Sequence, residues 1–379
     1  VLAHRAGVML EGHECFADWM VVHEREDGIP HIRVMRYDGS EDHRIIFPEP
    51  AYECGPHANP EFVTGTYRLG YQSMVTPSSV YDYDLSGRSM TLLKQQEVVG
   101  GYDASRFESR RIHAVAADGT RVPVTLVRRR DVAEDGTAAC LLQGYGSYGY
   151  PYPVAFSSNR LSLLERGVVV AIAHIRGGGD LGKEWHDAGR MASKMNTFTD
   201  FIACADALAA EGIVAPHRIA AEGGSAGGLL MGAVVNLAPE RFAAVMSHVP
   251  FVDVINTMSD ATLPLTVGEY EEWGNPEVAE QYGWMRRYDP YLNLRAGAYP
   301  PMLVRTSLND SQVMYWEPAK YVARLRTLKT DDNPLLLVTN MGAGHGGASG
   351  RYDRLREIAL DYAFMLWRLG VELSDPVGG

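Results

Sequence analysis

Six short apolar runs in the second part of the chain constrain its fold more than any other feature. Loops and segments long enough for helices separate them, and each run is apolar along its whole length instead of alternating with polar residues. Strands of this kind are typical of a parallel sheet with both faces covered. We therefore expect a doubly wound α/β domain from about residue 106. The runs begin at Thr137, Gly167, Arg218, Phe242, Pro300 and Asn333.

The clearest helical pattern lies between residues 196 and 212. Its apolar residues recur every three or four positions, which places them on one face of a helix. They are Phe198, Phe201, Ile202, Ala205, Leu208 and Ala209. Asn196 or Thr197 is expected to cap the start of this helix, and Gly212 is expected to end it.

The first 105 residues have a different pattern, in which short runs of β-forming residues alternate with turn signals. Two hairpin turns, at Asp38-Gly39 and Ser86-Gly87, recur at the spacing of one four-stranded propeller blade. Two blades cannot close a propeller. The chain also begins with Val1, so we expect a fragment, a processed product or a trimmed form of a longer protein. The change of pattern predicts two domains, residues 1–105 and 106–379.

Composition excludes several classes of protein. The net charge is -12, whereas a surface that binds nucleic acid needs positive charge. No run approaches the roughly 18 apolar residues of a membrane span, and the early charges do not fit a secretory signal. The four cysteines lie far apart without a CxxC pair, which fits a reducing cytoplasm and indicates neither a disulfide framework nor a zinc site. We expect no metal and no cofactor. The cysteines are Cys15, Cys54, Cys140 and Cys204.

One glycine-rich turn reads RGGGDLGKEW. Gly177, Gly179 and Gly182 have the GxGxxG spacing of a dinucleotide-binding turn, and Lys183 adds a partial match to a phosphate loop. A phosphate loop needs Ser or Thr after its lysine, where this chain has Glu184. The acidic residue that would bind a ribose is also missing from the end of the next strand. We interpret the turn as a structural loop beside the site, and tight NAD binding would instead favour a nucleotide-dependent oxidoreductase.

A second glycine-rich turn, residues 223–227, matches GxSxG around Ser225. A strand pattern precedes it and a helix pattern follows it, which is the setting of a nucleophile elbow. Any side chain two positions before or after the serine would collide with the neighbouring strand and helix. The turn lifts the Ser225 hydroxyl above the sheet, with the amino end of the next helix beneath it to favour negative charge. The alternative is a tight strand-to-helix turn without a chemical role.

A serine nucleophile needs a base, and the α/β-hydrolase order places an acid and then a histidine after it, each just past a strand. Asp310 ends the apolar run that begins at Pro300, and His345 lies in a glycine-rich loop after the next run. Ser225, Asp310 and His345 are therefore predicted to form a catalytic triad.

Several longer motifs, in the same order, resemble the prolyl oligopeptidase family of serine peptidases and, within it, the oligopeptidase B group. They are GYGSYG, HIRGGGDLGKEW, GGSAGGLLMG, VPFVDV, GEYEEWGNP, DSQVMYWEPAKYVARLR and GHGGASGR. The resemblance extends over essentially the whole chain. It implies that residues 106–379 form an α/β-hydrolase catalytic domain and that residues 1–105 are the last blades of a seven-bladed β-propeller with their connection. It also implies hydrolysis of short peptides on the carboxyl side of Arg or Lys.

The resemblance implies a role for each residue of the site. Ser225 is expected to be the nucleophile, His345 the general base and then acid, and Asp310 the residue that orients the imidazole. The Tyr145 hydroxyl and the backbone N–H of Ala226 are expected to hold the oxyanion, and such donors contribute roughly 3 to 4 kcal/mol each in related sites. The nearby Tyr148 and Tyr150 are interpreted as aromatic packing between domains.

Specificity is expected to lie in GEYEEWGNP. In an extended segment, residues two apart point the same way, so Glu269 and Glu271 would converge on one guanidinium while Glu272 turns aside. The resemblance assigns the same two glutamates to the cation pocket, although an acidic loop is by itself more often solvated. Arg326 matches a position near the bound peptide's backbone, but it is equally consistent with an exposed helical arginine.

The chain departs from the family's pattern at three places. Pro153 and Ala155 replace two acidic residues, from which we expect a weaker preference for paired basic residues. Gln143 replaces a tyrosine that is often found there. About five propeller blades are absent, so the expected partners are short basic peptides and the missing propeller portion of the same protein.

Two alternatives to a peptidase stay open. One is an esterase on the same fold, although a neutral ester has no use for an acidic pocket. The other is a catalytically idle fragment that binds a companion chain carrying the missing blades.

Overall fold

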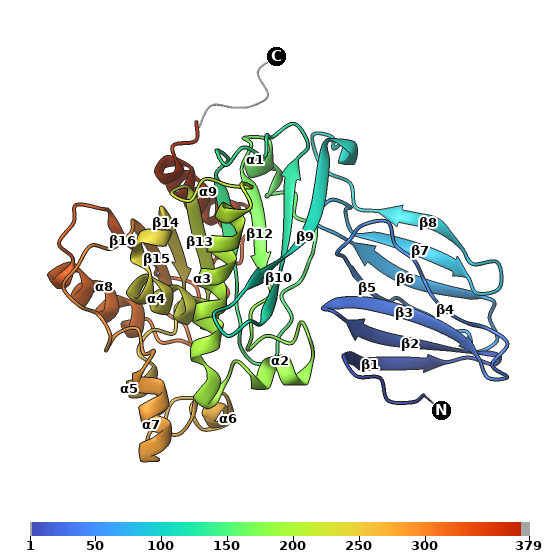
Figure 1. Cartoon of the computed structure of the whole chain (residues 1–379), viewed down its shortest axis with the longest axis horizontal. Helices are drawn as coiled ribbons and strands as arrows, with labels where there is room; N and C mark the ends of the chain where they lie inside the picture. Colours follow the sequence, from blue (N-terminus) through green and yellow to red (C-terminus); the bar gives the residue numbers. More distant parts are fainter. Residues whose placement is uncertain (1, 373–379) are drawn as a thin grey trace.

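A computed structural model describes residues 2–372 of the chain. Its first part consists of two four-stranded antiparallel sheets, one above the other at the right of Figure 1. The Asp38-Gly39 turn joins the last two strands of the first sheet, and the Ser86-Gly87 turn joins those of the second. The predicted pair of four-stranded blades is confirmed. The first sheet comprises β1 (Val8–Cys15), β2 (Trp19–Glu26), β3 (Ile29–Arg36) and β4 (Asp42–Arg44), and the second β5 (Glu53–Pro56), β6 (Thr66–Gln72), β7 (Ser79–Asp84) and β8 (Ser89–Gln95).

The second part is built on an eight-stranded sheet in the order β16-β15-β14-β13-β11-β12-β10-β9. The six apolar runs form the neighbouring parallel strands β11 to β16, as predicted. The antiparallel strands β9 and β10 complete one edge, and the uniform apolar pattern did not predict them. The strands are β9 (Phe107–Val115), β10 (Arg121–Arg129), β11 (Cys140–Gln143), β12 (Val169–Ala173), β13 (Ile219–Gly224), β14 (Ala244–His248), β15 (Met302–Ser307) and β16 (Leu335–Asn340).

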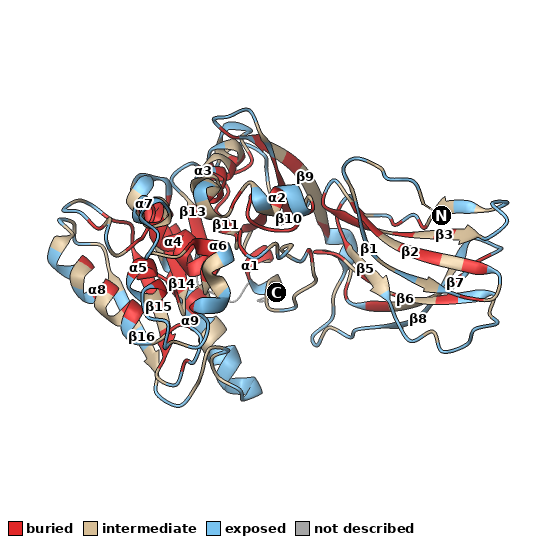
Figure 2. Ribbon diagram, turned by 90° about the horizontal axis from the view of Figure 1, so that it is seen from below, coloured by how far each residue is buried: buried red, intermediate tan, exposed pale blue. Residues whose placement is uncertain are grey.

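Helices cover both faces of this sheet (Figure 1). Successive strand residues point to opposite sides, so Leu142 belongs to the apolar core under α3 (Met195–Ala210), α4 (Ala226–Leu237) and α8 (Trp316–Leu328). Leu141 belongs to a second core under α1 (Leu161–Leu164) and α9 (Arg351–Leu369). The second core continues into the two small sheets, so one continuous apolar cluster joins both parts of the molecule. Figure 2 shows these buried residues along the strands of both parts.

Shorter elements complete the chain, and three of them lie together at the lower left of Figure 1: α5 (Val254–Met258), α6 (Tyr270–Trp273) and α7 (Ala279–Arg286). Helix α2 (Lys183–Asp187) follows β12. Single 3₁₀ turns occur at Ala104–Arg106, Met191–Ser193, Pro239–Arg241 and Val267–Glu269. Within residues 2–372, no helix combines the length and the apolar composition that crossing a membrane requires.

The predicted caps of the helix near residue 196 were wrong at its start and right at its end. Helix α3 begins at Met195, and its N-cap residue, Lys194, makes no side-chain cap. The two predicted caps bind other loops, because Asn196 donates to the Ala188 carbonyl and Thr197 to the Arg176 carbonyl. Beyond the last turn, Gly212 has a left-handed φ of 70°, which suits a glycine.

Candidate active site

Ser225 lies at the turn between β13 and α4 in a strained backbone conformation. Its φ is 60° and its ψ is -117°, a region that L residues rarely occupy. A Cβ on Gly223 would come within 2.3 Å of the Gly227 carbonyl oxygen, which supports the steric reason for glycine there. Ala226 is the first residue of α4, so its N–H has no acceptor within the helix. The turn thus presents a hydroxyl beside a free amide donor.

Asp310 and His345 form a hydrogen-bonded pair at the carboxyl ends of β15 and β16. His345 Nδ1 lies 2.8 Å from Asp310 Oδ2. The other carboxylate oxygen of Asp310 accepts the backbone N–H groups of Gln312 and Val313, each at 2.9 Å. The Asp310 side chain has no exposed surface. These bonds hold the carboxylate in one orientation toward the imidazole.

The loop after Asp310 also borders the serine. Gln312 and Val313 line the same cavity as Ser225, whereas His345 lines a neighbouring cavity. Within residues 2–372, no hydrogen bond joins Ser225 to His345. Such bonds often tighten only when substrate is bound. The structure therefore pairs the predicted acid and histidine directly, and it brings the serine to the adjoining loop.

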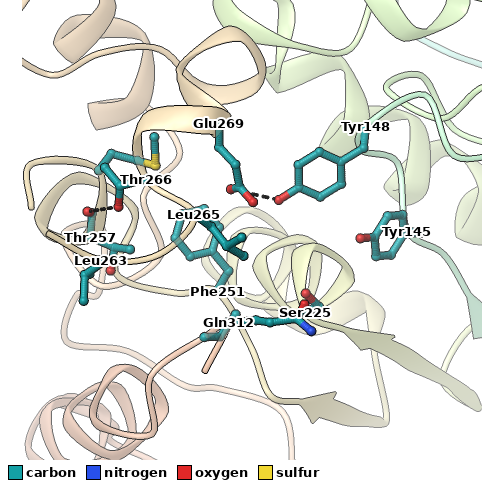
Figure 3. Close-up of a pocket in the computed structure, with 12 residues that line it drawn as sticks. Tyr145, Tyr148, Ser225, Phe251, Thr257, Leu263, Leu265, Thr266, Glu269 and Gln312 are labelled. Atoms are coloured by element: carbon teal, nitrogen blue, oxygen red, sulfur yellow. Dashed lines mark hydrogen bonds between the residues drawn. The ribbon is translucent and has the colours of Figure 1, made fainter. Parts of the chain in front are cut away.

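Both apolar and polar side chains line the cavity beside Ser225 (Figure 3). The hydroxyl of Tyr145 points into it, on the side of Ser225. Burial first, and then the charges of Glu269 and Glu272, raise the pKa of Tyr145 to about 12, while the nearby Ser225 side chain acts in the opposite direction. Tyr145 is therefore a protonated donor at neutral pH. The apolar walls include Phe251, Met258, Leu263 and Leu265.

Glu269 is the carboxylate that lines this cavity. One of its oxygens, Oε2, accepts a hydrogen bond from the Tyr148 hydroxyl at 3.0 Å (Figure 3). The same oxygen accepts a second hydrogen bond from Trp273 Nε1 at 2.8 Å. Burial raises the pKa of Glu269, and these two donors offset part of that effect. No cation among the described residues pairs with Glu269. A cationic side chain in the cavity would therefore find a desolvated carboxylate as its partner.

The expectation of an extended GEYEEWGNP segment was wrong. The segment forms a 3₁₀ turn followed by α6, so residues two apart are about 200° apart around the axis. Glu271 is consequently exposed and does not line the Ser225 cavity. The glutamate that turns inward is Glu272, which accepts the Tyr148 backbone N–H at 2.9 Å and lies 2.7 Å from His186 Nε2.

Two other predicted positions differ from expectation. Tyr148 lines the Ser225 cavity and packs edge-on against Trp273, so its interpretation as packing between domains was wrong. Arg326 is exposed on α8, donates to the Leu335 carbonyl at 3.2 Å and lines neither the Ser225 nor the His345 cavity. The structure therefore does not bring Arg326 to the site.

The glycines of RGGGDLGKEW pack against the loop that carries Tyr145. A Cβ on Gly177 would lie 2.2 Å from the Gly146 carbonyl oxygen, and one on Gly179 would lie 2.0 Å from that of Gly149. This backbone-to-backbone packing explains the glycines without a nucleotide, and it fits the interpretation of a structural loop beside the site.

Comparison with known proteins follows the same division of the chain. Residues 1–96 match the family model described as "Prolyl oligopeptidase, N-terminal beta-propeller domain", and residues 154–372 match the one described as "Prolyl oligopeptidase family". The chain belongs to the prolyl oligopeptidase family. It is 53% identical to dipeptidyl aminopeptidase BI of Pseudoxanthomonas mexicana and 43% identical to Protease 2 of Moraxella lacunata, over 98% and 96% of its own length. It spans only 51% and 52% of those two proteins.

Solved structures of the prolyl oligopeptidase family share the fold. Oligopeptidase B from Leishmania major has a TM-score of 0.90 and 40% identity, covering 97% of this chain and 53% of that structure. Oligopeptidase B from Trypanosoma brucei with covalently bound antipain has a TM-score of 0.92 and 39% identity, covering 98% of this chain and 54% of that structure. The predicted resemblance and fold class are therefore confirmed.

Hydrogen bonds occur at or beside the positions where the chain departs from the prolyl oligopeptidase pattern. Gln143 donates to Glu222 at 2.7 Å, at the end of β11. Between Pro153 and Ala155, the backbone N–H of Val154 donates to Glu53 of the small sheets at 2.8 Å. The stretch without acidic side chains thus contacts an acidic residue from the other part of the molecule.

A cluster of ionisable groups lies in the His345 cavity. Ligand atoms of Glu222, His248 and Asp361 come within 4.8 Å of one another, close enough to hold a metal ion. Both ring nitrogens of His248 already have partners, because Nε2 lies 3.1 Å from Glu222 and Nδ1 accepts from Arg305 at 3.1 Å. Arg305 also pairs with Asp361 at 3.1 Å. The arginine takes the place that a cation would occupy, so the cluster fits an ion-pair network better than a metal centre.

Proposed function

We propose that the chain is the catalytic part of a serine oligopeptidase that cleaves short peptides on the carboxyl side of Arg or Lys. The observation that carries this proposal is the position of Glu269, a half-buried carboxylate in the cavity that Ser225 also lines, which has no cationic partner within residues 2–372. The apolar walls suit the methylene groups of a basic side chain, and the carboxylate suits its charge. An esterase of neutral substrates would gain nothing from this arrangement.

In the proposed mechanism, Ser225 Oγ attacks the scissile carbonyl and its proton passes to His345 Nε2. Asp310 keeps the other ring nitrogen protonated and stabilises the imidazolium that forms. The oxyanion of the tetrahedral intermediate accepts hydrogen bonds from the Tyr145 hydroxyl and the Ala226 N–H. His345 then protonates the leaving amine, the acyl-enzyme forms, and a water activated by His345 releases the acid product.

Glu269 is the first partner of the substrate cation in this proposal. Glu271 would add long-range attraction from the surface, since it is exposed on the opposite side of the same short helical segment. Arg326 keeps only the role that family resemblance implies, contact with the peptide backbone, which requires a change of its present conformation.

Release of a fluorophore from amino-blocked Arg, Lys, Ala and Pro amides by the purified chain tests the proposal. We expect cleavage after Arg and Lys, loss of all cleavage in Ser225→Ala, and selective loss of Arg and Lys cleavage in the Glu269→Gln/Glu271→Gln double variant. Equal cleavage of all four amides would refute the specificity while sparing the triad. A folded chain without any activity would favour the idle fragment that needs a companion chain.

A second candidate is removal of dipeptides from the amino end of a peptide. The 53% identical relative carries the name dipeptidyl aminopeptidase BI, and the similarity extends over 98% of this chain. Dipeptide amides with a free amino group, compared with the same amides blocked, distinguish the two candidates. A strict requirement for the free amine would favour the second.

The organisation of the whole protein also belongs to this proposal. We place the domain boundary near residue 105, between the end of β8 at Gln95 and the start of β9 at Phe107. The missing propeller portion is the proposed partner of the two small sheets, because the chain spans about half the length of its relatives. The four cysteines are free, which suits the proposed cytoplasmic location.

A further inference from the structure

The loop of residues 144–150, here called the tyrosine loop, carries both Tyr145 and Tyr148. Three of its residues have left-handed φ angles: Gly146 at 71°, Tyr148 at 60° and Gly149 at 63°. For a bulky residue such as Tyr148, this conformation costs roughly 1–2 kcal/mol. The loop therefore depends on surrounding contacts to keep both tyrosines directed into the cavity.

A buried lysine supports the tyrosine loop from within the protein. Lys194 is only 1% exposed, and its Nζ donates to the Gly146 carbonyl at 2.6 Å and to Ser147 Oγ at 2.9 Å. The same ammonium group lies 4.9 Å from the centre of the Trp273 ring. Burial lowers the pKa of Lys194 to about 8. A buried ammonium group is costly unless it is hydrogen-bonded, and both of its hydrogen bonds go to this loop.

The buried carboxylate of Glu272 holds the tyrosine loop at Tyr148. Glu272 accepts the Tyr148 backbone N–H, and its charge favours the charged form of Lys194. Glu272 and Trp273 belong to α6, the helix that follows Glu269. The lysine, the tyrosine loop and α6 therefore contact one another, and the Tyr148 hydroxyl completes the set at Glu269.

We infer that Lys194 is a positioning residue that acts through the tyrosine loop, holding Tyr145 toward Ser225 and the Tyr148 hydroxyl against Glu269. The inference rests on the proposed function, in which Tyr145 stabilises the oxyanion and Glu269 binds the substrate cation. Lys194 itself is buried and touches neither group directly. Its removal should affect turnover through Tyr145 and cation binding through Tyr148.

A double-mutant cycle between Lys194→Met and Tyr145→Phe tests the first effect, with a blocked Arg amide as substrate. We expect Tyr145→Phe to lower kcat about 100-fold, as for loss of one oxyanion donor. Lys194→Met should lower kcat about 30-fold when Tyr145 is present and less than about 3-fold in the Tyr145→Phe background. The effects of substituting residues that act as a unit do not add. The matched control is Lys183→Met, which removes an exposed lysine of α2. This variant should leave kcat unchanged.

Two results would overturn the inference, and they are distinguishable. Equal losses from Lys194→Met in both backgrounds would leave the proposed function intact and show that the lysine has only a general structural role. An unchanged kcat in Tyr145→Phe would refute the oxyanion assignment and the inference with it. Ser147→Ala removes a single hydroxyl acceptor of Lys194 and repeats the cycle if Lys194→Met does not fold.

The second effect is measured without turnover, as calorimetric binding of N-acetylarginine amide to proteins that also carry Ser225→Ala. Lys194→Met should weaken this binding about 10-fold when Tyr148 is present and less than about 2-fold in the Tyr148→Phe background. Equal weakening in both backgrounds would overturn the inference. Binding that is unaffected by Glu269→Gln would refute the cation pocket of the proposed function instead.

Discussion

The residues around Ser225 that we propose for chemistry and those that we propose for recognition are held in different ways. On the chemical side, Ser225, Asp310 and His345 follow β13, β15 and β16, parallel strands of one sheet. Parallel strands end at the same edge, so the order of the strands brings these three loops together. On the recognition side, Tyr148, Glu269, Glu272 and Trp273 come from a loop, a 3₁₀ turn and one short helix. No strand carries them, and hydrogen bonds accepted by the two glutamate side chains set their positions.

The difference shows where each side is sensitive to change. Tight backbone packing at the elbow holds the chemical side, so an added methyl group there would clash with backbone atoms. Buried charges and their donors hold the recognition side, so removing one charge or one hydroxyl should alter it without unfolding the protein. Substitutions on the two sides should therefore differ in both the size and the kind of their effects.

The largest effect is expected on the chemical side, from Asp310→Asn. An amide at this position no longer keeps the His345 imidazole in the tautomer that accepts the serine proton, so kcat should fall about 10⁴-fold. Hydrolysis of a blocked Arg amide measures this loss. The exposed Asp332→Asn is the control and should keep normal kcat. A loss below about 10-fold for Asp310→Asn would place the acid of the triad elsewhere.

Gly223→Ala tests the backbone packing of the elbow. Its Cβ would lie 2.3 Å from the Gly227 carbonyl oxygen, so we expect a loss of about 3 kcal/mol in the free energy of unfolding, together with loss of activity. Urea unfolding measures the change. Gly283→Ala, at an exposed position of α7, should instead stabilise by about 0.5–1 kcal/mol, because within residues 2–372 only the local backbone of its own helix comes within 4 Å of the new Cβ. Similar effects at both glycines would contradict the proposed packing constraint.

On the recognition side, the single variants Glu269→Gln and Glu271→Gln should differ. Loss of the half-buried charge should lower kcat/KM for Arg amides about 100-fold, equivalent to about 2.7 kcal/mol, whereas loss of the exposed charge should lower it less than about 3-fold. Cleavage of an Ala ester should change in neither variant. An equal loss for Arg and Ala substrates would show that Glu269 acts on the chemistry and not on specificity.

The smallest effect concerns the pH dependence of stability near the cavity wall. Glu317 of α8 accepts the N–H groups of Val252 and Asp253 and the hydroxyl of Thr257, which lines the cavity. Burial raises its pKa to about 7, so the folded state binds this proton more tightly than the unfolded state. Stability should therefore decrease as pH rises from about 4.5 to about 7, by on the order of 2 kcal/mol.

Glu317→Gln should remove the Glu317 contribution to the slope in urea unfolding measured across the same pH range. A residual slope should persist from Asp289 and Asp361, because burial raises the pKa of each carboxyl to about 6. An unchanged slope in the variant would show that Glu317 is ionised in the folded protein throughout the range.

Sequence patterns were most informative where side chains follow long apolar strands. The runs ending near Ser225 and Asp310 are largely buried on both faces, so their composition alone indicated the strands and the edge at which they end. The run before His345 is also apolar, although it forms the partly exposed edge strand β16. The antiparallel strand β9 carries polar residues such as Glu108 and Arg110, and no uniform apolar run marked it. Prediction was therefore best where burial on both faces dictated the residue type.

The recognition side could not be predicted in the same way. The segment containing Glu269 is too short for a periodic pattern, and a choice between helix and strand decides which glutamate turns inward. The tertiary structure chose the helix, which buried Glu272 and exposed Glu271. The burial of Lys194 could not be predicted either, because a lysine next to a helix start is ordinarily exposed. Burial of its ammonium group depends on the hydrogen bonds that the tyrosine loop accepts.

The amino-acid sequence by itself thus determined the parallel sheet, the paired four-stranded sheets and the strained turn at Ser225. Each of these follows from local properties: hydrophobic pattern, turn residues and the absence of a Cβ. Only the tertiary structure decided which charged side chains are buried around the cavity and which partners they have. Burying a charge depends on donors and acceptors that distant segments supply, and no local pattern in the chain records those contacts.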